Sequence, residues 1–319
     1  MLLPAALAGC AGAQPQAATL ASTTPVTKGR GHAHPERVHA HPGRAAAAGA
    51  PAGVTERTLT FVDTSRRVRF PHRAPEPRRL VTVIRYPAAA TGPLPLVVFA
   101  HGFAVTPAYY FRLLNAWAAA GYVVAAPVFP LENLHAPGGS DESDLINQPR
   151  DMSFVITSML ALAGARGNAL SGRIDPKEIG LSGQSDGGET ALAVAYDRFF
   201  LDPRVRAAAI LSGAQIPGAG LYFPRGTPPL LAVQGTADVI NQPRFTYAFF
   251  ARARRPKYLL RLLGAGHLPP YTDEQPQLSI VGRVTTAFFN LYLKHTAAGL
   301  ARMRATGNVV GRAALTVDR

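Results

Sequence analysis

The chain from Val54 onward consists of short apolar runs that alternate with longer amphipathic segments. In the short runs several apolar residues follow one another directly, as in strands that are buried on both faces of a sheet. The longer segments repeat apolar residues at the three- and four-residue spacing of a helix that packs on a core. The predicted strands are 80–87, 94–100, 121–127, 178–182, 207–212, 229–235 and 258–263, and the predicted helices are 109–120, 150–164, 187–200, 244–254 and 280–296.

Strands that alternate with helices predict an α/β fold with a mainly parallel central sheet and helices on both faces. In such sheets ligands bind beyond the carboxyl ends of the strands, so the residues that follow each strand are the candidates for a functional site. The predicted domain covers residues 54–300. Residues 301–319 are rich in arginine and are predicted to form a basic C-terminal tail.

The N-terminal part of the chain has a different composition. Residues 11–53 are rich in Ala, Gly, Pro, Thr and His with almost no large apolar side chains, which predicts a disordered tether. Within it the motif HAHP occurs at residues 32–35 and 39–42. Its histidines could bind a metal, but such a segment lacks the supporting contacts of a dedicated site. We interpret the motif as part of the low-complexity tether and expect no metal site.

Residues 1–10 form a short apolar run that ends in LAGC, which resembles the lipobox of bacterial lipoproteins. No Lys or Arg precedes Cys10, although a signal peptide ordinarily begins with positive charge. We therefore interpret these residues as a truncated signal peptide, and Cys10 is the candidate for lipidation. An ordinary Ala-rich N-terminus is the alternative. The expectation is an exported protein, either secreted or anchored in the cell envelope.

Composition and charge exclude some of the functions that this fold could have. Hydrophobic residues make up 47% of the 319 residues, enough for a large core. The formal net charge of +14 comes from scattered arginines with little aromatic interleaving, so we expect no nucleic-acid partner and consider attraction to a membrane surface or an anionic polymer instead. Because Cys10 is the only cysteine, an intramolecular disulfide or an iron–sulfur cluster is excluded. We expect a monomer.

The strongest candidate chemistry follows the strand 178–182. Residues 183–187 read GQSDG and match the G-x-S-x-G pattern of a nucleophile elbow, a sharp turn that exposes a serine above the sheet. The pentapeptide alone is weak evidence, but here it stands between an apolar strand and an Ala-rich helix. Ser185 is therefore the candidate nucleophile. Gly188 would allow the following helix to pack closely.

Two further strands end in groups that could activate Ser185. Asp238 follows the strand 229–235, and His267 follows the strand 258–263 after a glycine-rich turn. A serine hydroxyl becomes nucleophilic when an imidazole takes its proton, and a carboxylate holds that imidazole in the required tautomer. The chain order Ser185, Asp238, His267 is the order of the α/β-hydrolase triad. A turn cap at Asp238 and a loop role for His267 are the alternatives.

The strand 94–100 leads into His101, Gly102 and Phe103, where this arrangement places one half of an oxyanion hole. The candidate donors are the backbone N–H groups of Phe103 and Asp186. His101 is a rival for the catalytic base, but we expect it to shape the loop. We expect the Asp186 side chain to point away from the oxyanion, because a carboxylate there would oppose catalysis.

With these motifs, residues 57–297 resemble the α/β-hydrolase superfamily. The similar stretches, which include VIRYPAAATGPLPLVVFAHGF, NQPRDMSFVI and IDPKEIGLSGQSDGGETAL, are typical of the group of dienelactone hydrolases, chlorophyllases and platelet-activating-factor acetylhydrolase-like enzymes, which also includes actinobacterial cutinases and polyester hydrolases. The resemblance implies hydrolysis of carboxylic esters through an acyl-serine, with no cofactor. Polyester hydrolases of the group usually carry Met at the position of Asp186 and often a disulfide, so the resemblance to them is weaker.

The expected function is thus that of a serine esterase, with a small-molecule or lipid-like ester as substrate. Two alternatives remain open at this point. A binding lipoprotein of the envelope could keep the fold without catalysis, and a serine hydrolase acting on amides or peptides would share the same triad.

Overall fold

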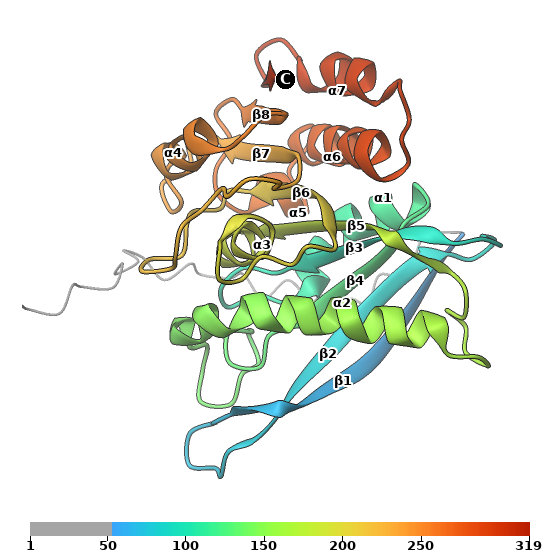
Figure 1. Ribbon diagram of the computed structural model, residues 1–319. Helices are drawn as coiled ribbons and strands as arrows, with labels where there is room; N and C mark the ends of the chain where they lie inside the picture. Colours follow the sequence, from blue (N-terminus) through green and yellow to red (C-terminus); the bar gives the residue numbers. More distant parts are fainter. Residues whose placement is uncertain (1–52) are drawn as a thin grey trace, which may run out of the picture. The chain divides into compact units, whose positions relative to one another are not determined.

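The predicted sheet is present and extends further at both edges than the sequence indicated (Figure 1). The computed structural model describes residues 53–319. Its strands are β1 (Val54–Val68), β2 (Glu76–Pro87), β3 (Leu94–Ala100), β4 (Val123–Val128), β5 (Ile174–Gln184), β6 (Val205–Leu211), β7 (Leu230–Gly235), β8 (Lys257–Leu262) and β9 (Ala313–Asp318). Its helices are η1 (Pro107–Tyr110), α1 (Phe111–Ala119), η2 (Glu142–Asn147), α2 (Gln148–Gly164), α3 (Asp186–Tyr196), α4 (Pro243–Arg252), α5 (Pro269–Thr272), α6 (Gln277–Leu293) and α7 (Gly299–Gly307).

The strands lie in the order β1-β2-β4-β3-β5-β6-β7-β8-β9. The central strands from β4 to β8 are parallel, and the pairs β1–β2, β2–β4 and β8–β9 are antiparallel. The expectation of a mainly parallel sheet is therefore confirmed. This arrangement is an α/β-hydrolase fold. It brings the ends of β3, β5, β7 and β8, where the candidate residues lie, to one edge of the sheet.

Helices cover both faces of the sheet, and alternate residues of the central strands pack into two separate cores. In β3, Val98 packs in the core under α2, α3 and α4, whereas Val97 and Phe99 pack in the core under α1 and α6. Strands buried on both faces require consecutive apolar residues, which explains why the short runs predicted these strands correctly.

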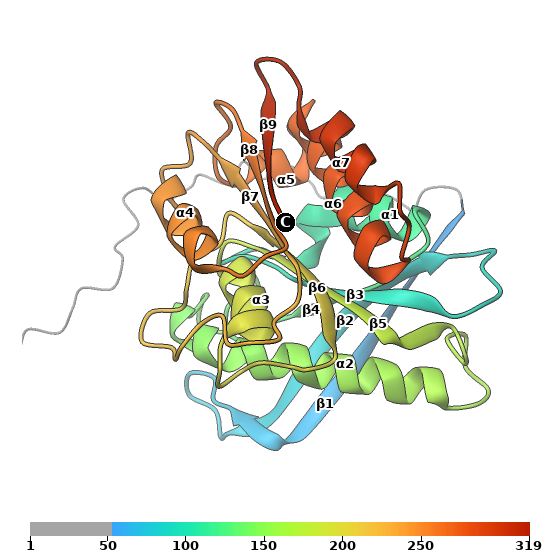
Figure 2. The ribbon, with the colours of Figure 1, turned by 45° about the horizontal axis from the view of Figure 1, so that its top comes forward.

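The C-terminal residues correct the prediction of a basic tail over 301–319. Most of α7 and all of β9 lie in this range, and β9 pairs with β8 from Lys257 opposite Asp318 to Leu262 opposite Ala313. Figure 2 shows β9 beside β8, with α7 next to α6. The physical reason is that the apolar side chains of β9 and the buried Met303 of α7 close the core at this edge. The arginines of this segment lie on the outer surface and obscured that pattern.

Cys10 and the predicted tether, apart from Gly53, lie outside the described residues. Lipidation and export therefore stay predictions from the sequence. Over residues 53–319, none of the helices combines the length and the apolar character that crossing a bilayer requires.

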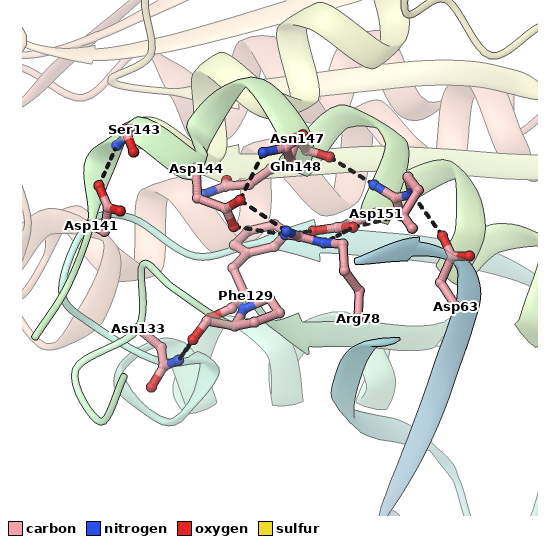
Figure 3. A network of polar contacts seen from close by, with 12 residues as sticks. Asp63, Arg78, Phe129, Asn133, Asp141, Ser143, Asp144, Asn147, Gln148 and Asp151 are labelled. Carbon is pink, nitrogen blue, oxygen red and sulfur yellow. Dashed lines mark hydrogen bonds and ion pairs between the residues drawn. The ribbon is translucent and has the colours of Figure 1, made fainter. Parts of the chain in front are cut away.

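A buried ion-pair network fixes the β1–β2 hairpin to the helices on its inner face (Figure 3). The Arg78 guanidinium donates to both oxygens of Asp144, at 2.9 and 2.7 Å, and to both oxygens of Asp151, at 3.0 and 2.6 Å. Arg66 also reaches Asp151, with 2.6 Å between Nη2 and Oδ1. Burial by itself lowers the pKa of Arg78, but the hydrogen bonds with the two carboxylates raise it above its ordinary value. The network anchors η2 and the first turn of α2.

Replacing Arg78 by methionine is expected to destabilise the protein by about 3–5 kcal/mol, because it leaves the Asp144 and Asp151 carboxylates buried with too few donors. Denaturant unfolding of purified wild type and variant measures the difference. The matched control is Arg79→Met, since Arg79 is the neighbouring residue on the exposed face of β2. An equal loss of stability in both variants would contradict this account of the network.

Candidate active site

Ser185 occupies a strained turn between β5 and α3. Its backbone angles are φ 58° and ψ −125°, a conformation that L-residues rarely adopt. The flanking glycines are needed for close approach: a Cβ on Gly183 would lie 2.0 Å from the Gly187 carbonyl oxygen, and one on Gly187 would lie 2.1 Å from that of Ala100. The elbow predicted from GQSDG is therefore present, with the strain on the serine itself.

The structure brings Ser185, His267 and Asp238 together from three separate strand ends. Ser185 Oγ lies 2.9 Å from His267 Nε2, and His267 Nδ1 lies 2.8 Å from Asp238 Oδ2. Because a carboxylate only accepts, the imidazole carries its proton on Nδ1 and leaves Nε2 to accept the serine proton. This arrangement can turn a serine hydroxyl into a nucleophile.

The Asp238 carboxylate is itself held by fixed donors. Its Oδ1 accepts from the backbone N–H of Ile240 at 3.0 Å, and its Oδ2 accepts from Gln234 Nε2 at 3.2 Å. The hydroxyl of Thr246 donates to Gln234 Oε1 at 2.6 Å and fixes the orientation of that amide. Asp238 is only 3% exposed, so these contacts take the place of water around its charge.

His101 shapes the loop after β3, as the sequence indicated. It is fully buried; its Nδ1 lies 2.8 Å from the Gly102 carbonyl oxygen, and its Nε2 accepts from the Phe129 N–H at 3.0 Å. Burial lowers the pKa of His101 to about 4, and the hydrogen bond to Gly102 offsets only part of this effect. The ring is neutral at physiological pH, and its two nitrogens contact backbone groups of the turns after β3 and β4.

Two residues near the site were missed in the sequence. Gln184, the last residue of β5, donates from Nε2 to the His267 carbonyl oxygen at 3.1 Å and lies 3.3 Å from His267 Nε2. Its Oε1 accepts from the Tyr110 hydroxyl at 2.7 Å, and that hydroxyl also accepts from the Gly102 N–H at 3.3 Å. Together these contacts connect the turn after β3 to His267. The position of Gln184 directly before Ser185 was the available signal, whereas no sequence motif indicated that the Tyr110 hydroxyl would reach Gln184.

The two candidate oxyanion donors lie on the two loops that meet at Ser185. Phe103 is in the turn after β3, which approaches so closely that a Cβ on Gly102 would lie 3.1 Å from the Ser185 Cβ. Asp186 is the first residue of α3, where a backbone N–H has no acceptor within the helix. The geometry is compatible with the predicted pair of donors.

The Asp186 side chain departs from the expectation that it points away. Its Oδ1 lies 3.4 Å from Ser185 Oγ, and the residue is only 6% exposed. A buried helix N-terminus favours this position, because the first turn attracts a negative side chain.

Access to Ser185 is narrow, since the residue is 7% exposed and the His267 side chain 12%. Tyr110 and Phe223 are buried in the two cores. A cavity of about 610 Å³ lies between α1, α6 and α7, away from Ser185. Within residues 53–319 no group of three or more His, Cys, Asp or Glu side chains could hold a metal ion.

The comparisons with known proteins agree with the α/β-hydrolase fold. The chlorophyllase family model matches residues 53–237, more than half of the chain, so the chain belongs to the chlorophyllase family. The matched range contains Ser185 and ends one residue before Asp238. This confirms the chlorophyllase part of the predicted resemblance, whereas the relation to cutinases and polyester hydrolases stays a prediction.

Two relatives are chlorophyllases of Arabidopsis thaliana. The chain is 32% identical to chlorophyllase-1 over 153 residues, which are 48% of this chain and 44% of that protein. It is 22% identical to chlorophyllase-2 over 248 residues, covering 64% of this chain and 74% of that protein. The match to chlorophyllase-1 thus spans less than half of that relative.

Proposed function

We propose that the protein is a carboxylic ester hydrolase with Ser185 as nucleophile, His267 as general base and Asp238 as the carboxylate that orients it. The observation that carries the proposal is the unbroken chain of contacts from Ser185 Oγ through the His267 ring to Asp238, with Ser185 on a strained elbow. The family and the names of its relatives favour esters as the substrate class.

The reaction would proceed in two halves. Ser185 Oγ attacks the ester carbonyl carbon as its proton passes to His267 Nε2, and the resulting oxyanion accepts from the N–H groups of Phe103 and Asp186. When the ester C–O bond breaks, His267 returns the proton to the leaving alcohol. Water then attacks the acyl-serine in the same manner, releases the acid and restores the Ser185 hydroxyl.

The loops at the strand ends support an apolar ester as substrate. Leu134 and Val239 are exposed by 44% and 81%, and they lie on the loops after β4 and β7. These loops follow parallel strands at the same edge of the sheet as Ser185. Exposed apolar side chains at this edge would favour an acyl or alkyl chain over a charged substrate.

A substrate panel tests the proposal. The purified protein is expected to hydrolyse a short-chain nitrophenyl ester at least about a hundredfold faster than the matching nitroanilide, because nitrophenolate leaves more readily than nitroaniline. Longer acyl esters, a phospholipid, a polyester, chlorophyll and a peptide then define the preferred substrate class. Folded protein without ester turnover would favour a binding protein, and faster cleavage of the anilide or peptide would favour an amide hydrolase.

A further inference from the structure

A second pair of carboxyl groups lies beside the candidate site. Glu132 is in the loop between β4 and η2 and is completely buried, and the Asp186 side chain is close enough for hydrogen bonding with it to raise the pKa of Glu132. Among the described residues no fixed donor reaches Glu132 Oε1, Glu132 Oε2 or Asp186 Oδ2. Three buried carboxyl oxygens without a donor are costly unless a proton is present between them.

The loop that carries Glu132 is fixed on both sides. Asn133 donates from Nδ2 to the Phe129 carbonyl oxygen at 2.7 Å (Figure 3), and the Phe129 N–H donates to His101 at 3.0 Å. The Glu132 carbonyl oxygen accepts from the Ala104 N–H at 2.9 Å, next to Phe103. The Glu132 backbone is therefore joined directly to the turn that carries one of the proposed oxyanion donors.

The charged side chains that act on Glu132 are themselves carboxylates. Burial raises the pKa of Glu132 well above its ordinary value, and the hydrogen bond and charge of Asp186 and the charges of Asp144 and Glu142 act in the same direction. From α3, Glu189 adds a third buried carboxyl, whose pKa is also raised well above its ordinary value by burial and by Asp186.

The other ionisable groups nearby do not supply a positive charge to the pair. Tyr110 of η1 is uncharged, because burial and the nearby carboxylates raise its pKa above the ordinary value. The Arg78 guanidinium is directed at Asp144 and Asp151, and His101 is neutral. One proton shared between Glu132 and Asp186 is thus the arrangement that satisfies both groups.

We propose that Glu132 is a positioning residue that carries a proton and donates it to the Asp186 carboxylate, which keeps that carboxylate from opposing the oxyanion. The role in turnover rests on the proposed ester hydrolysis. With the proton present, the pair holds one negative charge and Asp186 has a fixed partner. Once the proton is lost, two buried anions lie next to the Asp186 N–H and disfavour the developing oxyanion.

Loss of the Glu132 proton at alkaline pH is therefore expected to lower turnover. The protonated form of Glu132 is the active one, so turnover falls as the pH rises through the raised pKa of Glu132. Glu132→Gln keeps a donor for Asp186 but does not titrate. We expect this variant to retain wild-type kcat at neutral pH and to lose the alkaline decline. Glu142→Gln removes an exposed charge that raises the pKa of Glu132, so this variant is expected to keep the decline and to move it toward lower pH.

A variant without any donor tests the positioning role separately. Glu132→Leu is expected to lower kcat by about tenfold with little change in KM, the scale of one lost hydrogen bond to a charged group. Adding Asp186→Asn removes the unpartnered charge and is expected to restore most of the kcat. An alkaline decline that persists unchanged in Glu132→Gln would overturn the proposal.

The proton can also be observed without turnover. The infrared difference spectrum of wild type minus Glu132→Gln at neutral pH is expected to contain the C=O stretch of a protonated, buried carboxyl group. Its absence would overturn the proposal even if the protein hydrolyses esters. Conversely, the band together with no ester turnover would leave the shared proton intact and contradict the proposed function.

Discussion

Replacing Ser185 by alanine is expected to lower turnover of a short-chain nitrophenyl ester by about six orders of magnitude, the loss typical of a removed serine nucleophile. The reason is that no other hydroxyl takes the position 2.9 Å from His267 Nε2. Steady-state kinetics on the purified variant, with single-turnover measurement for the slow reaction, give the ratio.

Ser182→Ala is the matched control for this loss. Ser182 is also a buried serine of β5, and its hydroxyl donates to the Ala209 carbonyl oxygen at 2.7 Å. Its removal is expected to cost about 1 kcal/mol of stability and to leave turnover nearly unchanged. Retained ester hydrolysis in Ser185→Ala would contradict the assignment of Ser185 as the nucleophile.

The second large loss of kcat is expected on substitution of Asp238. Asp238→Asn replaces the acceptor of the His267 Nδ1 proton by a group that can donate, which favours the wrong tautomer of the imidazole. A loss of about four orders of magnitude in kcat is expected, with the fold intact. The pH dependence of kcat, measured in parallel, reports whether His267 still acts as the base.

Asp186, the acidic residue next to Ser185, serves as the control for Asp238→Asn. Asp186→Asn is expected to keep kcat within about tenfold of wild type, because the hydrogen bonds of the His267 ring go to Gln184, Asp238 and Ser185 and the proposed role of Asp186 uses its backbone N–H. A loss in Asp186→Asn as large as that in Asp238→Asn would show that the acid has been chosen wrongly.

The central strands and the three candidate residues could be predicted because each depends on local pattern. Strands buried on both faces need consecutive apolar residues, and a parallel sheet places the residues after such strands at one edge. Ser185, Asp238 and His267 each follow a strand of this kind, so their meeting could be inferred without knowledge of the side-chain geometry.

The edge strands could not be found in this way. β1 has polar or exposed side chains at many positions, with the burial of an edge strand that faces the core on one side. β9 is short and follows an Arg-rich helix, so its apolar residues did not stand out. Their places depend on pairing with β2 and β8, which is a property of the folded chain.

The supporting contacts were missed for a related reason. Tyr110 reaches Gln184 across 74 positions in the sequence, and Glu132 meets Asp186 across a loop that contains no recognisable motif. Such contacts are set by how loops pack at the strand ends. The sequence indicated the chemical groups at the centre, while the groups that hold them became visible only in the structure.

Covalent labelling of the native protein with a fluorophosphonate, followed by mass spectrometry of its peptides, shows directly whether Ser185 is an activated nucleophile. This reagent phosphonylates a serine that is activated by a neighbouring base. A single modified residue, Ser185, is expected, together with loss of labelling in His267→Ala. Labelling at another residue, or none in folded protein, would contradict this expectation.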